Sequence, residues 1–192
     1  MDFKGANLFY THMRGVNLAG ANFENATLDL AIMLDANLEG ANFRNARLNS
    51  TGLDGANLKN ADLSHAYLVA KMNKANLEGA TLVNVMAAAN MNNQSMGMIR
   101  TELDYANLKN ANLENADLSH CTMRFGKLQN ANLKGVNFTW CDLSKVNFSG
   151  ADLTGANFTE AKLTDAVFKD IKGKDSLMGL ETAKDLNSTE LN

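Results

Sequence analysis

The sequence predicts an all-β solenoid, in which the chain coils around a dry axis and turns a corner at every fifth residue. Three observations support this prediction. A large apolar residue recurs at every fifth position from residue 3 to residue 68 and again from 103 to 168. A small residue, usually Ala, lies two positions before it, and Asn or Asp often lies between the two. Large side chains also repeat every twenty residues, which indicates four units per coil, as in Phe3, Phe23 and Phe43.

A five-residue period does not fit the common secondary structures. On an α-helix, five residues rotate the side chain by about 140°, so the apolar residues would spiral around the axis without forming a dry face. On a flat strand, an odd step places successive apolar residues on opposite faces, and a coiled coil requires a period of about 3.5 residues. A chain that bends once per unit instead directs every large residue toward one axis.

Length and composition limit the classes of function. The chain has 192 residues, enough for one domain, and a formal net charge of -3 with acids and bases interspersed. A basic surface for nucleic acid is therefore not predicted. No leader pattern follows Met1, and no apolar run approaches the roughly 20 residues of a membrane helix. These features predict a cytoplasmic protein that binds neither a membrane nor nucleic acid directly.

The repeated unit Ala-Asn/Asp-Leu/Phe-x-x resembles the pentapeptide-repeat family, and the resemblance covers about residues 1–171. It implies a right-handed quadrilateral β-helix of about eight coils, in which the small residue and the large central residue point inward. A bacterial protein is expected. The family includes quinolone-resistance proteins of the Qnr type, which bind DNA gyrase in place of DNA.

The repeat is interrupted near the middle of the chain. Its frame slips by one residue after Leu68, and residues 83–100 fit no frame except for one unit around Met91. An irregular loop or bulge within the single 1–171 domain is therefore predicted. Its methionines could fill a distorted coil, or Met91 and Met96 could project as adaptable contacts for a partner.

The two ends of the solenoid lead to different expectations. Residues 172–192 are predicted to form a capping segment and a mobile tail, because exposed terminal coils need covering. Leu177, Leu180, Ala183 and Leu186 have a loosely helical spacing, which predicts a short helix with Asp175 or Ser176 as its N-cap. At the other end, Phe3 already belongs to a coil, so either a homodimer forms through this coil or upstream residues precede it.

No pattern of catalytic, cofactor-binding or metal-binding residues emerges. Asp62, Ser64 and His65 match a hydrolytic triad in composition only, because no nucleophile elbow or oxyanion donor is implied. The three histidines lack the spacing of metal ligands. Cys121 and Cys141 take the place of Ala on adjacent coils, where their spacing allows a disulfide. Side chains that point the same way suit a disulfide poorly, so two buried thiols are favoured. The chain is therefore not expected to be an enzyme or to need a cofactor.

The candidate interaction surface is aromatic. Tyr105 and Phe125 lie twenty residues apart at the last position of their units, and they should form one outward column. His120 and Trp140 should form a neighbouring column. Tyr and Trp are frequent anchors of protein interfaces, although a distortion at Gly126 could instead bury Phe125. These four residues, with Met91 and Met96, are the predicted contact residues for a protein partner.

Two functions remain open from the sequence. The first is a non-enzymatic scaffold that binds an unidentified protein. The alternative is a DNA-mimicking binder of DNA gyrase or topoisomerase, which the family resemblance suggests. The mixture of Lys and Glu along the predicted columns opposes that alternative, because DNA mimicry needs a continuous anionic face.

Overall fold

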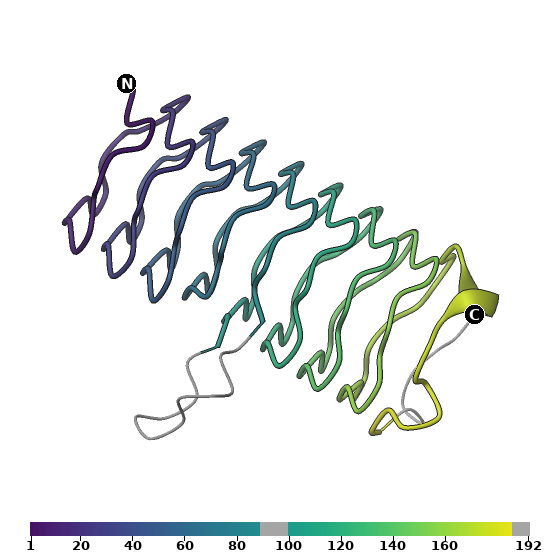
Figure 1. The fold of residues 1–192 in the computed structure, drawn as a ribbon. Helices are drawn as coiled ribbons and strands as arrows, with labels where there is room; N and C mark the ends of the chain where they lie inside the picture. The colour runs from purple at the N-terminus through teal and green to yellow at the C-terminus, as the bar shows by residue number, and fades with distance from the viewer. Residues whose placement is uncertain (89–99, 186–192) are drawn as a thin grey trace, which may run out of the picture.

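The chain forms a straight rod of stacked four-sided coils, with its two ends at opposite ends of the rod (Figure 1). The computed structural model describes residues 1–88 and 100–185. The one helix in these residues is a single 3₁₀ turn, η2, at Lys174–Ser176. All β pairing in the described residues consists of isolated parallel bridges, one on each side of each coil.

The bridges confirm four units per coil. Residues twenty apart pair in most of the rod, as in Asp2 with Asn22 and Asn132 with Asp152. Successive bridges lead from Asp2 to Lys172 in eight steps, through Asn22, Asn42, Asp62, Thr81, Asn112, Asn132 and Asp152. With a strand spacing of about 4.8 Å, eight steps correspond to a rod of about 38 Å.

Each unit repeats one set of backbone hydrogen bonds. The central residue donates to the next coil, as Leu58 N does to Asn76 O at 2.7 Å, and Asn76 N donates back to Ala56 O at 2.9 Å. The fifth residue of the unit, here called the corner residue, also donates to the next coil, as Asn60 N does to Glu78 O at 2.9 Å. These bonds satisfy the backbone between coils and make each coil dependent on its neighbours.

The core is a set of columns that run along the rod axis. Among the described residues, the central residues from Leu18 to Phe168 are buried, and so are the small residues two positions before them from Ala21 onward. Phe23 and Phe43 stack with ring centroids 4.7 Å apart, and Phe148 and Phe168 stack at 4.9 Å. Burial of each such side chain contributes about 1.5–3 kcal/mol before the entropy cost of ordering. The inward direction of the central residues, predicted from the sequence, is confirmed.

Both irregularities of the repeat lie at the same corner of the rod. The frame slip shortens the pairing interval to 19 residues, as in Gly52 with Lys71, and the later insertion lengthens it to 31, as in Met86 with Asp117. Thr101 closes the coil beside the insertion, because its buried hydroxyl lies 2.7 Å from both Leu68 O and Ala87 O.

The interruption expected at 83–100 begins later than the sequence indicated. Val85 and Ala87 are buried at inward positions, and Met86 bridges Tyr67 on one side and Asp117 on the other. Residues 83–87 therefore continue the coil, because Val and Ala can occupy inward positions that more often hold Ala and Leu. Met91 and Met96 lie outside the described residues.

The predicted C-terminal helix is wrong in extent. Beyond the single turn η2, the segment runs as another coil in which Met178 bridges Asn157 and Lys184 bridges Lys162. The N-cap of η2 is Gly173, not Asp175 or Ser176. Gly173 and Gly179 have φ of 77° and 75°, and a Cβ on either would lie about 2.5 Å or less from a Thr on the coil below. These glycines let the backbone close tightly over the last coil.

Leu177, Leu180 and Ala183 pack against the core, so this segment covers the C-terminal end as a coil with one 3₁₀ turn. The first coil is less covered, because Phe3, Leu8 and Met13 are only partly buried. Phe3 nevertheless stacks on Phe23, with ring centroids 5.1 Å apart.

Candidate functional site

The candidate site lies at the corners of the rod, where some outward side chains are not of the types that the turn favours. In the complete five-residue units that the structure describes, the corner residue has a positive φ between about 50° and 75°, a region that Gly and Asn adopt most readily. Two neighbouring corners depart from these residue types. The Tyr105 corner consists of Gly15, Asp35, Gly55, Lys74, Tyr105, Phe125, Lys145 and Asp165, and the His120 corner contains Tyr10, Leu30, Ser50, His120, Trp140 and Glu160.

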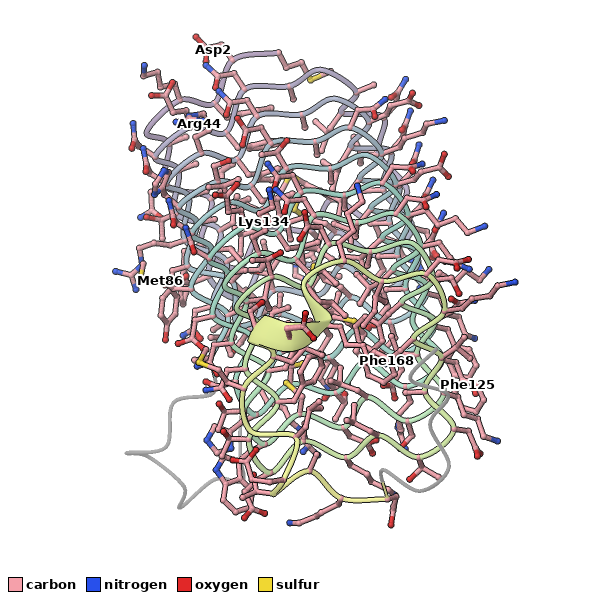
Figure 2. All side chains as sticks on the ribbon, turned by 90° about the vertical axis from the view of Figure 1, so that its right-hand side faces the viewer. Asp2, Arg44, Met86, Phe125, Lys134 and Phe168 are labelled. Carbon is pink, nitrogen blue, oxygen red and sulfur yellow. The ribbon has the colours of Figure 1, made fainter. Side chains whose placement is uncertain are left out.

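Tyr105 and Phe125 form the predicted outward column. Their rings are stacked with centroids 4.7 Å apart and planes inclined by 4°. Tyr105 is 53% exposed and Phe125 is 40% exposed, so the alternative in which Phe125 is buried does not occur. Phe125 projects at one edge of the rod and Met86 at the opposite edge (Figure 2). Lys145 lies over the Phe125 ring, 5.2 Å from its centroid, at a distance suited to a cation–π contact.

His120 and Trp140 form the neighbouring column. Their rings are parallel within 2°, with centroids 6.3 Å apart. Trp140 is 50% exposed, whereas His120 is half-buried. The C-terminal coil reaches this column, because Lys184 lies 4.8 Å from the centroid of Trp140 and pairs with Glu160 at 3.1 Å. Part of the Trp140 surface is therefore covered by the chain itself.

The face between the two corners carries a tightly held ion pair. Arg124 Nε donates to Asp104 Oδ2 at 2.9 Å, and Arg124 N donates to Asp104 Oδ1 at 2.8 Å. The guanidinium NH2 group contacts the same carboxylate. The bonded carboxylate raises the pKa of Arg124 above its usual value. This arginine is therefore neutralised by its own chain.

A surface hollow of about 420 Å³ follows the N-terminal part of the Tyr105 corner. It exists because Gly55 has no side chain at a position where neighbouring coils carry Asp35 and Lys74. Arg14 and Asp35 pair at 3.2 Å in its wall, and Asp54 Oδ1 accepts a hydrogen bond from Asn73 N at 2.8 Å. The lining residues are Arg14, Leu34, Asp35, Asp54, Gly55, Asn73 and Lys74.

The other faces mix charges and amide ladders. Lys4 pairs with Glu24 at 3.0 Å and Lys134 with Asp152 at 3.4 Å, so opposite charges meet on adjacent coils. One face carries an asparagine ladder, in which each side-chain amide donates to the preceding one over 2.9–3.2 Å, through Asn17, Asn37, Asn57, Asn76 and Asn107.

The triad-like residues Asp62 and Ser64 form a hydrogen bond within the turn. Asp62 Oδ1 accepts a hydrogen bond from Ser64 N at 2.9 Å, and Arg44 pairs with Asp62 at 3.1 Å. Although burial alone would raise it, the pKa of Asp62 is lowered by the Ser64 hydrogen bonds and by Arg44. Ser64 is buried, while His65 is exposed.

The two cysteines stack inside the rod as free buried thiols, which confirms their predicted place. Their Sγ atoms are 2.9 Å apart, and Cys141 Sγ donates to Leu118 O at 2.8 Å. Burial and the neighbouring Cys121 raise the pKa of the Cys141 thiol. Within residues 1–88 and 100–185, no group of three or more His, Cys, Asp or Glu residues could hold a metal ion. No helix in this part of the chain is long and apolar enough to cross a membrane.

Comparison with protein families matches pentapeptide repeats, in eight copies, over residues 2–35, 31–69, 98–135 and 131–170. The chain belongs to the pentapeptide-repeat family. The matched segments end at residue 69 and resume at residue 98, and most of the insertion between Ala87 and Thr101 falls in this gap. The rod is accordingly the right-handed four-sided β-helix of this family.

Among solved structures, the rod is similar to HetL, a pentapeptide-repeat protein involved in heterocyst differentiation regulation from the cyanobacterium Nostoc sp. strain PCC 7120. The match has 30% sequence identity and a TM-score of 0.52, and it covers 99% of this chain and 82% of HetL. The rod is also similar to trypsin-treated QnrB1, a plasmid-mediated fluoroquinolone resistance protein, with 19% identity, a TM-score of 0.58, and coverage of 96% and 88%. The comparison with curated proteins found no match.

Sequence periodicity located the aromatic residues of both columns but missed the cations on them. Lys145 lies twenty residues after Phe125, so the same period could have placed it on that ring. Lys184 could not have been found in this way, because the last coil is longer than the others and Lys184 lies 44 residues after Trp140.

Proposed function

We propose that this pentapeptide-repeat rod is a non-enzymatic scaffold that binds another protein through two aromatic columns, Tyr105 with Phe125 and His120 with Trp140. The supporting observation is that Tyr105, Phe125 and Trp140 are exposed at positions where the turn favours Gly or Asn. Their side chains add nothing to the turn. Exposed Tyr and Trp are, however, frequent energetic centres of protein interfaces.

The similarity to HetL supports the same proposal. HetL is described as involved in the regulation of heterocyst differentiation, and a non-catalytic rod can regulate by occupying a surface of another protein. The proposal includes a cytoplasmic setting in a bacterium, as the sequence predicted. The proposal includes no catalytic activity, because Asp62 of the triad-like group accepts a hydrogen bond from Ser64 N within the turn and pairs with Arg44.

Affinity capture from an extract of the source cells tests this proposal. The bait proteins are the wild type, the triple variant Tyr105→Asn/Phe125→Asn/Trp140→Asn, and Tyr10→Asn as a matched control. Tyr10 is 58% exposed on the first coil, far from the two aromatic columns. A partner should be retained by the wild type and the control and lost from the triple variant. Equal retention by all three baits would remove the aromatic columns from the proposal.

The alternative function is DNA mimicry toward DNA gyrase or topoisomerase. Its support is the fold shared with QnrB1. The charges favour the scaffold instead, because the sign changes at each step along the column Glu39, Lys59, Glu78 and Lys109. A supercoiling assay with purified gyrase, with and without ciprofloxacin, separates the two functions. Unchanged supercoiling and no protection from the drug would exclude mimicry.

Self-association through the first coil is a second mode of binding within the same proposal. Phe3, Leu8 and Met13 are only partly buried there, and Phe9 is 56% exposed on the same coil. Sedimentation equilibrium of the wild type and Phe9→Asn tests it. A monomer at all concentrations would contradict this mode and would not affect partner binding through the corners.

A further inference from the structure

One strip of the Tyr105 corner combines an aromatic pair with a lysine on either side. Lys74, Tyr105, Phe125 and Lys145 occupy this corner on four successive coils. The backbone fixes their order, because Lys74 N donates to Asp104 O at 2.8 Å, Tyr105 N to Arg124 O at 2.8 Å, and Phe125 N to Ser144 O at 3.0 Å. With coils about 4.8 Å apart, the strip is about 15 Å long.

The four strip residues carry two positive charges, and Asp165 lies on the same corner one coil beyond Lys145. Asp104 is occupied by Arg124, and Glu102 lies 3.9 Å from Lys71. The ion pairs within the described part of the chain include neither Lys74 nor Lys145. Lys145 instead has the Phe125 ring as its contact. The strip therefore offers two ammonium groups, one at each end of an exposed apolar surface.

The hollow lies next to the strip, beyond Lys74, and provides a concave surface for a bound chain. Lys74 forms one wall of its 420 Å³, and Leu34 contributes an apolar surface. Asp35 is neutralised there by Arg14, and Asp54 already accepts a backbone hydrogen bond. A corner is convex by itself, and a flat partner surface could not reach into the hollow. A flexible segment can enter it, so the hollow favours a segment of that kind as the ligand.

From this arrangement we infer that the strip binds an extended acidic segment of a partner protein. A large apolar side chain of that segment lies against Tyr105 and Phe125, and carboxylates on both sides of it pair with Lys74 and Lys145. The segment needs about five residues to span the strip, at about 3.3 Å per extended residue. This inference rests on the proposed scaffold function and adds the chemistry of the partner and the place where it binds.

Selection of random 12-residue peptides displayed on phage tests the inference. The wild-type rod is the target, and the Tyr105→Asn/Phe125→Asn variant is used for counter-selection. Asn is chosen because it already occupies many corner positions, so the backbone should be retained. Selected peptides should share a large apolar residue flanked by Asp or Glu. Synthetic copies are then measured by fluorescence anisotropy, with circular dichroism to confirm that each variant is folded.

The expected affinities follow from the contacts. Loss of both rings should weaken the peptides by about tenfold or more, and Lys74→Gln or Lys145→Gln should weaken them about threefold, with a further decrease at high salt. Tyr10→Asn should have no effect. Basic or uncharged peptides, equal binding to the double variant, or no selected peptide would each overturn the inference. A captured partner that depends on Trp140 but not on Tyr105 and Phe125 would also overturn it while leaving the scaffold function intact.

Discussion

The Tyr105 corner and the corner one unit further along the coil bend the chain in the same way but carry different side chains. The second corner, here called the Asn130 corner, contains only Gly, Asn and one Asp, at Gly20, Gly40, Asn60, Gly79, Asn110, Asn130, Gly150 and Asp170. Phe125 and Asn130 have φ of 60° and 58°, and each backbone N–H donates to the next coil over 3.0 Å.

This comparison separates what the fold requires from what it only permits. Because the Asn130 corner makes the turn with Gly and Asn, the rod does not need an aromatic side chain at a corner. The inward positions are restricted to residues that can be buried, since Leu133 and Phe138 on the same coil are fully buried. The type of residue at a corner can therefore be selected for binding, whereas the type of residue at an inward position is set by the stability of the rod.

The largest effect on stability is expected when a charged residue replaces an inward one. Leu133→Lys should destabilise the rod by about 4 kcal/mol or more, because the ammonium has no partner in the core. Thermal unfolding followed by circular dichroism measures this change. Asn130→Lys, three residues earlier at a corner, is the matched control and should unfold near the wild-type temperature. Similar losses in both variants would contradict the distinction between inward and corner positions.

A smaller effect is expected where the His120 corner departs from the regular turn. Thr101→Val leaves the Leu68 and Ala87 carbonyls without the hydroxyl and should cost about 1–3 kcal/mol. Thr51→Val, at the equivalent position beside the frame slip, removes a single bond to Leu28 O and should cost less. Urea unfolding of both variants gives the comparison. An equal cost would mean that Thr101 has no special part in closing the insertion.

Exchange of the corner residues should change stability still less. Tyr105→Asn/Phe125→Asn loses a stacked pair worth about 0.5–1.5 kcal/mol and gains a residue better suited to positive φ. The two effects oppose each other, so the free energy of unfolding should stay within about 1 kcal/mol of the wild type in urea. A larger loss would show that the aromatic pair supports the fold and would weaken the link between the Tyr105 corner and binding.

The smallest effect concerns pH. Hydrogen bonds from Thr154 hold the pKa of Asp152 below its usual value, against an opposing effect of burial and with help from Lys134. The pKa of Asp62 is lowered in a similar way. A lowered folded-state pKa stabilises the rod above the unfolded pKa, and that contribution is lost as pH falls through the folded value. Asp62→Asn/Asp152→Asn should therefore reduce the loss of stability between about pH 5 and pH 2, measured by urea unfolding. An unchanged pH profile would count against these contacts.

Much of the fold followed from periodicity, and the exceptions have physical causes. The five-residue and twenty-residue periods predicted the inward columns and the pairing of Phe23 with Phe43, because every coil repeats the same backbone bonds. The helical spacing around Leu177 and Leu180 was misleading. Gly173 and Gly179 permit a close backbone approach, so those leucines reach the core from a coil.

The same limit applies to the candidate site. The sequence placed Tyr105 on Phe125 and His120 on Trp140, since both pairs obey the period of twenty. Whether these rings were exposed required the structure, because burial at a corner depends on the neighbouring coils. The hollow at Gly55 also appears only when four coils are stacked, since its walls come from residues 14 to 74.

The sequence by itself determined the rod, its four-sided coils and the inward residues, because a strict local period repeats the same backbone geometry at every step. The tertiary structure decided how the last coil closes, which cation covers Trp140, and which corner leads into a hollow. These features join residues whose separation departs from the period or whose side chains meet only across several coils. Their positions therefore depend on how the coils stack.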